Sequence, residues 1–110
     1  MAFTEKKLGQ NQINNVSNTT LYTVPTGKKG IIRAMILTNT TASDATISIW
    51  HVPNASSSAD SNSLFKTFSV PANDFVHIYT YVVMDTVGDK IDALAGTASA
   101  ITVSLYGAEI

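Results

Sequence analysis

Two histidines are the first side chains in this sequence to examine for metal chemistry. His51 and His77 lie in separate β-like segments, and no second histidine or cysteine is spaced to assist either one. A zinc site needs three or four ligands at characteristic spacings. We therefore expect both histidines to be structural or surface side chains.

Three aspartates in the segment DTVGDKID form the densest acidic group. Asp85, Asp89 and Asp92 do not follow the calcium-loop pattern, in which ligands alternate before a closing glutamate. Aspartates also stabilise turns by accepting hydrogen bonds from nearby backbone N–H groups, and Gly88 supplies an unusual φ. We interpret the segment as a turn, with a weak divalent-cation site as the alternative. No metal or cofactor is expected.

Nucleophilic catalysis has no recognisable motif here. Serines are plentiful, but none lies in the G-x-S-x-G pattern that exposes a nucleophile at a sharp turn. The isolated glycines do not make a phosphate-binding loop, and the absence of cysteine removes disulfides and thiolate chemistry. The sequence predicts that the protein is not an enzyme.

The charge balance bears on possible partners. Seven Lys and Arg against eight Asp and Glu give a net charge of −1, whereas nucleic-acid-binding proteins usually carry a basic excess. Apolar runs such as 82–84 are far too short to span a bilayer. Charged residues make up 14% of the chain, below the roughly 25–35% suited to the surface of a soluble domain. We expect no nucleic-acid or membrane partner, and a surface suited to a large assembly.

Two surface features are candidates for recognition. Trp50 shares a strand face with Thr46 and Ser48, where it could stack on a sugar ring, although packing in the core or an interface is the favoured interpretation. The densest basic group of the domain comprises Lys28, Lys29 and Arg33. It either protects a strand edge or contacts an acidic partner.

The elements that must position these residues are predicted to be strands. Residues 45–52 and 100–106 alternate apolar and polar side chains, and the whole chain shows about seven or eight such segments without a convincing helix. This spacing is typical of a single antiparallel β-sandwich or jelly roll over residues 19–110. Residues 1–18 are polar and are interpreted as an N-terminal arm. It is either a frayed terminus or a segment that becomes ordered on a neighbouring subunit through residues such as Phe3 and Leu8.

Two segments carry most of this prediction. Residues 20–41 are interpreted as a hairpin whose turn contains Pro25 and Gly27. Residues 75–84 form the strongest strand and are apolar on both faces. One face belongs to the core, and the other is a candidate interface between subunits. Its members are Phe75, His77, Tyr79 and Tyr81.

Several segments together resemble small virion structural proteins of tailed bacteriophages. Residues 20–28 (TLYTVPTGK) are similar to the family opening TLYTVPAGK, and residues 43–53 (SDATISIWHVP) to SDATVSIYLVP. An NT turn lies between them at residues 39–40. Residues 88–93 (GDKIDA) match the pattern GD-x-I-x-A, and residues 101–109 (ITVSLYGAE) match the closing strand of the family. The resemblance covers roughly residues 20–109.

The resemblance implies a non-enzymatic β-sandwich of a phage particle, made in the host cytoplasm and located in the virion. The leading hypothesis is a capsid decoration, or cement, protein that stabilises the shell as a homo-oligomer, with a trimer favoured, across major capsid subunits. A tail, neck or fibre component is the first alternative. A carbohydrate- or receptor-binding module using Trp50 is the second.

Overall fold

The computed structural model describes residues 4–13 and 18–110, and apart from one short 3-10 turn the regular elements within them are β-strands. No helix in this part of the chain is long and apolar enough to cross a membrane. The strands are β1 (Thr4–Ile13), β2 (Thr19–Thr23), β3 (Gly30–Asn39), β4 (Ala45–Val52), β5 (Ser63–Val70), β6 (Phe75–Met84), β7 (Lys90–Ala95) and β8 (Ile101–Glu109), and a short 3-10 turn, η1 (Asp60–Asn62), precedes β5.

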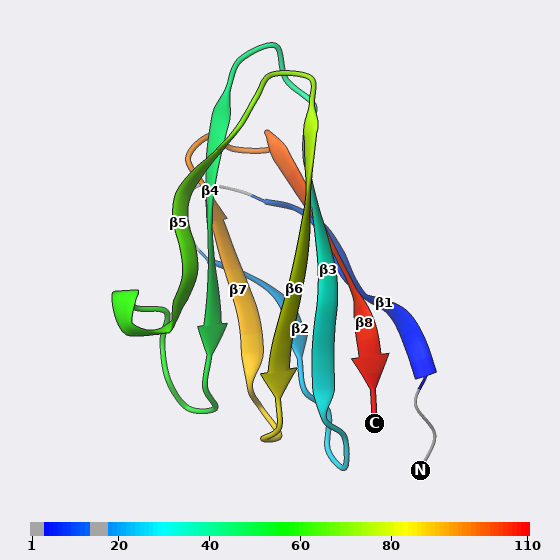
Figure 1. Cartoon of the computed structure of the whole chain (residues 1–110). Helices are drawn as coiled ribbons and strands as arrows, with labels where there is room; N and C mark the ends of the chain where they lie inside the picture. The colour runs from blue at the N-terminus through cyan, green and yellow to red at the C-terminus, as the bar shows by residue number, and fades with distance from the viewer. Residues whose placement is uncertain (1–3, 14–17) are drawn as a thin grey trace.

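The strands form two four-stranded antiparallel sheets packed face to face (Figure 1). Sheet A has the order β1-β8-β3-β6, and sheet B has the order β2-β7-β4-β5. The pairs β4–β5, β3–β6, β2–β7 and β1–β8 are all antiparallel, so the chain is a long hairpin rolled into a sandwich. This is the eight-stranded arrangement of a jelly roll, and it confirms the predicted all-β sandwich.

Alternating side chains explain why these segments pair as they do. In β8, Ile101, Val103 and Leu105 are fully buried, whereas Tyr106 on the other face is exposed. An alternating strand can bury its apolar face only against a second layer. The two inner faces supply that layer for each other, in a core whose largest fully buried side chains include Ile13, Ile32, Met35, Leu37, Ile47, Ile49, Met84, Ile91, Ile101 and Leu105.

The expected division between an arm and a domain is wrong for the described part of residues 1–18. Residues 4–13 form β1, which pairs with β8 along its length at the edge of sheet A. Leu8 packs against the core, and Ile13 is fully buried within it. The polar composition concealed this strand because backbone pairing, and not apolar alternation, supplies most of its contacts. Phe3 lies outside the described residues.

The predicted hairpin at residues 20–41 is also wrong, although its turn is present. Lys28 N–H donates to the Pro25 carbonyl oxygen at 3.2 Å, and Gly27 has a φ of 78°. However, β2 belongs to sheet B and β3 to sheet A. Val24 instead exchanges backbone hydrogen bonds with the β6–β7 turn, donating to Asp89 and accepting from Gly88. The turn therefore carries the chain from one sheet to the other.

Candidate interaction surface

The outer face of sheet A carries a row of exposed apolar side chains along its edge strand. We name Phe75, His77, Tyr79, Tyr81 and Val83 of β6 the aromatic stripe. Phe75, Tyr79 and Tyr81 are 61%, 81% and 69% exposed, and Val83 is 44% exposed. The His77 and Tyr79 rings lie together, with centroids 4.1 Å apart. Large exposed apolar groups gathered on one face mark an interaction site.

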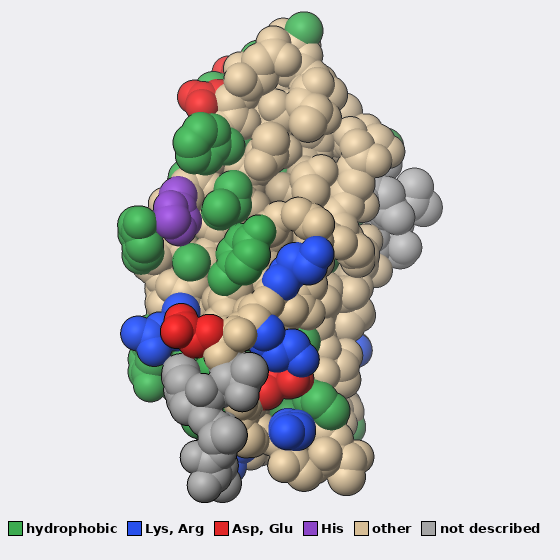
Figure 2. All heavy atoms as spheres, turned by 90° about the vertical axis from the view of Figure 1, so that its right-hand side faces the viewer, with side chains coloured by type: hydrophobic (Ala, Val, Ile, Leu, Met, Phe, Trp, Pro, Cys, Tyr) green, Lys and Arg blue, Asp and Glu red, His purple; other side chains and the backbone are tan. Residues whose placement is uncertain are grey.

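The neighbouring strands extend this face toward the middle of the sheet. Ile36 of β3 lies opposite His77, and Ala34 of β3 lies opposite both Tyr79 and Tyr106 of β8. Tyr106 is 37% exposed. Figure 2 looks onto this side of the molecule, where hydrophobic side chains surround a histidine and the Lys and Arg side chains gather nearer the other end. The face therefore combines an apolar part with a cationic part.

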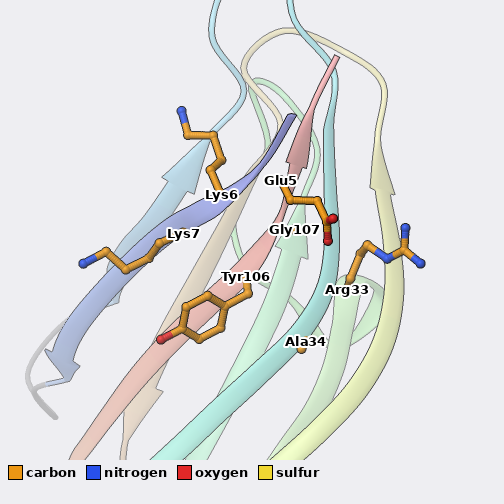
Figure 3. A pocket seen from close by; sticks show the side chains of 7 residues that line it. All are labelled: Glu5, Lys6, Lys7, Arg33, Ala34, Tyr106 and Gly107. Atoms are coloured by element: carbon orange, nitrogen blue, oxygen red, sulfur yellow. The ribbon is translucent and has the colours of Figure 1, made fainter. Parts of the chain in front are cut away.

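The cationic part surrounds a shallow hollow of about 400 Å³, lined by residues of β1, β3 and β8. Figure 3 shows that its floor has no long side chain, because Gly107 and Ala34 lie there. The side chains that stand around it are those of Glu5, Lys6, Lys7, Arg33 and Tyr106, so three cations and one carboxylate line the hollow. A Cβ at Gly107 would lie 1.8 Å from the Ile31 carbonyl oxygen, so only glycine fits this crossing of strands. We name this feature the basic hollow.

Arg33 reaches the basic hollow because β3 is irregular at this point. The pairing of β3 with both β6 and β8 shifts between Ile32 and Ala34. Arg33 and Ala34 consequently break the alternation of burial along β3, and Arg33 is exposed. A bulge of this kind re-aims one side chain. Alternation in the sequence assigns successive residues of a strand to opposite faces of the sheet. It therefore gives no indication of a bulge such as this one.

Lys28 and Lys29 lie at the same end of the molecule but line a separate hollow. That hollow has a volume of about 530 Å³ and also includes Asp85, Val87 and Ile110. Lys29 and Ile110 exchange backbone hydrogen bonds of 3.0 Å, which hold the turn against the end of the β8 segment. The structure thus places the three predicted cations at one end, divided between two hollows.

Glu109 joins three strands beneath this cationic end. Lys6 of β1 forms an ion pair of 2.9 Å with Glu109 Oε1, and the Tyr22 hydroxyl of β2 donates to Oε2 at 2.6 Å. The Tyr22 hydrogen bond, followed by the one from Lys6, holds the pKa of Glu109 below its ordinary value of 4.5. Burial, together with the nearby carboxylate, raises the pKa of Tyr22. The Tyr22 bond connects the two sheets, and the Lys6 ion pair joins two strands of sheet A.

The aspartates examined for cation binding have structural roles in this fold. Asp89 is buried and accepts the Asn54 N–H at 2.9 Å, and buried Asp92 accepts the Thr20 hydroxyl at 2.8 Å. Within residues 4–13 and 18–110, no group of three or more His, Cys, Asp or Glu side chains is placed to hold a metal ion. These partners are distant in sequence, and Asp92 lies within β7 (Lys90–Ala95), so the two side chains connect separate segments and do not stabilise the turn by accepting from nearby backbone groups.

Trp50 does not present an open ring face. It lies on β4 opposite Asp92 of β7 and Ser63 of β5, and only 9% of its surface is exposed. A sugar-stacking platform requires an accessible aromatic face, so this geometry favours packing.

Three side chains on the outer face of sheet A were not among the predicted site residues, namely Tyr106, Val83 and Lys7. Only the strand order brings Tyr106 onto the face of sheet A that carries Tyr79, with Ala34 of β3 between the two tyrosines.

Comparisons with known proteins found matches to the fold of this chain but none to its sequence. No family model and no curated protein matches it. Among solved structures, a chain from the structure of infectious bursal disease virus, Gx strain, matches 98% of this chain at 10% identity with a TM-score of 0.54. A chain from the Gt strain structure matches 97% at 7% identity, with a TM-score of 0.46 that is too low to support an argument.

The first of these matches shows a shared fold. This chain covers only 30% of the length of the viral chain, so it corresponds to one part of a longer protein. At 10% identity, the likeness concerns the sandwich and not any side chain on its surface. The chain therefore has a β-sandwich arrangement that also occurs in a protein of a virus structure.

Proposed function

We propose that the protein is a non-enzymatic structural component of a virus particle, and specifically a capsid decoration protein of a tailed bacteriophage. The observation that carries this proposal is the outer face of sheet A, which combines the aromatic stripe with the basic hollow on a jelly-roll fold. The viral origin of the matched fold supports the setting. The segments resembling phage virion proteins support the phage assignment.

The aromatic stripe provides a contact of moderate strength. The exposed parts of its aromatic rings and of Tyr106 correspond to about two and a half whole side chains, or roughly 500 Å². At about 25 cal/mol per Å², burying that area contributes about 12 kcal/mol before association costs of about 4–15 kcal/mol. A single copy would bind weakly. Oligomers presenting several such faces to a repeating shell would bind far more tightly.

The cations at one end of the molecule would orient the protein on its partner. Arg33, Lys28 and Lys29 are exposed on a molecule that otherwise carries few charges. Charges at the rim of an interface mainly guide association and select the partner. We propose that they face an acidic surface of the major capsid protein or another virion protein. The protein would then be located in the virion as a homo-oligomer.

The two alternatives differ in how well they fit this surface. A tail, neck or fibre component would use the same face, so the structure favours neither location in the particle. A carbohydrate-binding module based on Trp50 is disfavoured because the indole is 9% exposed. The buried aspartates, which are engaged in structural hydrogen bonds, give no support to an enzymatic role.

Binding to purified shells that lack the protein tests the proposal. We expect saturable binding that weakens as salt rises. Arg33→Glu should reduce affinity about threefold to fivefold, which corresponds to an exposed ion pair of roughly 0.7–1 kcal/mol. The matched control is Lys66→Glu, because Lys66 lies on sheet B, paired with Asp60. Wild-type protein that does not bind any shell or other virion component would overturn the proposal.

A further inference from the structure

The four edge strands of the sandwich differ in how they are protected against pairing with another strand. β1 carries Glu5, Lys6 and Lys7 and shifts register before Gly9. β2 has only five residues and is also irregular. β5 includes a lysine, and Thr67 within it has a φ of 50°. Charges, bulges and short length are the usual devices that prevent edge-to-edge association.

β6 carries no charge and is not short, and its one irregularity is an extra residue in its pairing with β3, between Val82 and Tyr79. It is ten residues long, and its sequence FVHIYTYVVM contains no Lys, Arg, Asp, Glu or Pro. In sheet A, it pairs with β3 and leaves its other edge open. Exposed and covered side chains alternate along β6 without a break. Where the pairing with β3 shifts, β6 advances three residues, from Val82 to Tyr79, against two on β3, and burial on β6 keeps alternating across this shift.

We propose that this free edge pairs with β6 of a second copy of the chain, antiparallel about a two-fold axis. Residues that face each other across such a pair lie on the same side of the sheet. The register that matches all five stripe residues places Tyr79 opposite Tyr79, His77 opposite Tyr81, and Phe75 opposite Val83. The two sheets A then form one eight-stranded sheet.

The composition of β6 argues that the partner is another β6. Cross-strand pairs are favourable when they are aromatic or β-branched and unfavourable when like charges meet. In this register every stripe pair is apolar or aromatic, and the flanking acids, Asp74 and Asp85, lie just outside β6. An acidic or basic partner would find no complementary charge along this strand.

The open edge of β6 itself supplies the contact. Pairing satisfies the backbone N–H and C=O groups along this edge. Cross-strand neighbours of the aromatic stripe also pack against each other, while the outward faces of the rings stay available to a shell.

This inference deepens the oligomer part of the proposed function. Pairing about a two-fold axis gives a dimer and differs from the trimer favoured by the sequence analysis. It joins two aromatic stripes into one wider apolar face that can lie on a shell. The test needs only purified protein, so its failure would leave the proposed attachment to a virion open and remove only the β6 contact.

Single cysteines test the register, because the natural chain has none. Tyr79→Cys places two thiols directly opposite each other, within the Cα separation of about 4.4–6.8 Å that disulfides require. Tyr81→Cys is the matched control on the same strand. In this register its two copies are offset by four residues, or about 13 Å. We expect rapid oxidation to a covalent dimer for Tyr79→Cys and at least tenfold slower dimerisation for Tyr81→Cys.

Sedimentation of the unmodified protein completes the test. Wild type should sediment with twice the chain mass of 11.7 kDa, and Tyr79→Lys should be a monomer because two lysines would face each other. Tyr79 is 81% exposed, so this change should leave the fold intact, as circular dichroism would verify. A wild-type monomer or trimer, or equal cross-linking at both cysteine positions, would overturn the inference.

Discussion

Glu109 shows how one side chain connects distant parts of this chain. It lies on β8, receives a hydrogen bond from Tyr22 of β2 and pairs with Lys6 of β1. β2 and β8 belong to opposite sheets, so the Tyr22 bond closes the sandwich at the cationic end. Hydrogen bonds to a charged group are stronger than neutral ones, particularly where solvent is partly excluded. Glu109 therefore stabilises the fold beneath the proposed contact surface.

Tyr22→Phe should lower the free energy of unfolding by about 1.5–3 kcal/mol, because it removes a charge-assisted hydrogen bond and retains the ring. Urea denaturation followed by circular dichroism measures the change. Tyr106→Phe is the control, since that ring is partly exposed on the outer face. Equal stability of Tyr22→Phe and wild type would show that the Tyr22–Glu109 bond contributes nothing.

The lowered pKa of Glu109 predicts how stability depends on pH. A carboxyl group whose pKa is lower in the folded state stabilises the protein at pH values above its ordinary pKa of 4.5. This contribution is lost as pH falls from that value through the folded pKa. The stability difference between wild type and Glu109→Gln should therefore be largest near neutral pH and shrink in acid. A difference that grew in acid would contradict the lowered pKa.

The local pattern of side chains in the sequence predicted β4 and β6 but did not predict β1. Residues 45–52 and 75–84 were predicted with the bounds that β4 and β6 have, because their side chains fit a half-buried sheet. β1 reads TEKKLGQNQI and offers few apolar anchors. Its position depends on pairing with β8, almost a full chain length away. The pattern of neighbouring residues in the sequence cannot show that a strand pairs with one so far away along the chain.

Ile13→Ala tests whether β1 belongs to the sandwich. Ile13 is fully buried in the core, so its truncation should cost about 2–5 kcal/mol of unfolding free energy. Asn11→Ala, at an exposed position of the same strand, is the control and should change stability by less than about 0.5 kcal/mol. Chemical denaturation measures both. A negligible effect of Ile13→Ala would restore the interpretation of residues 1–18 as a separate arm.

The same reasoning explains the error at residues 20–41. Pro25 and Gly27 correctly predicted a turn, since Gly27 adopts a positive φ. A turn alone does not decide whether its flanking strands pair. Here Val24 bonds to the β6–β7 turn, and β2 joins β7 in the opposite sheet. Strand order is a property of the rolled chain, and short-range sequence signals do not contain it.

The complete domain brings together features that were separate in the sequence. Phe75, His77, Tyr79 and Tyr81 were predicted to share a face from their spacing on one strand. Tyr106 and Lys7 joined that surface only because β8 and β1 lie in the same sheet. Few charges and one apolar face are features of a protein that functions in contact with others. We propose that the proteins this chain contacts are other components of a virus particle.

Imaging of the purified particle by electron cryomicroscopy tests this claim most directly. We predict that the protein occupies many regular positions in the particle, with the outer face of sheet A covered by neighbouring protein and Tyr79 and Tyr81 buried there. A purified particle that lacks the protein, or one in which this face of every copy is open to solvent, would contradict the claim.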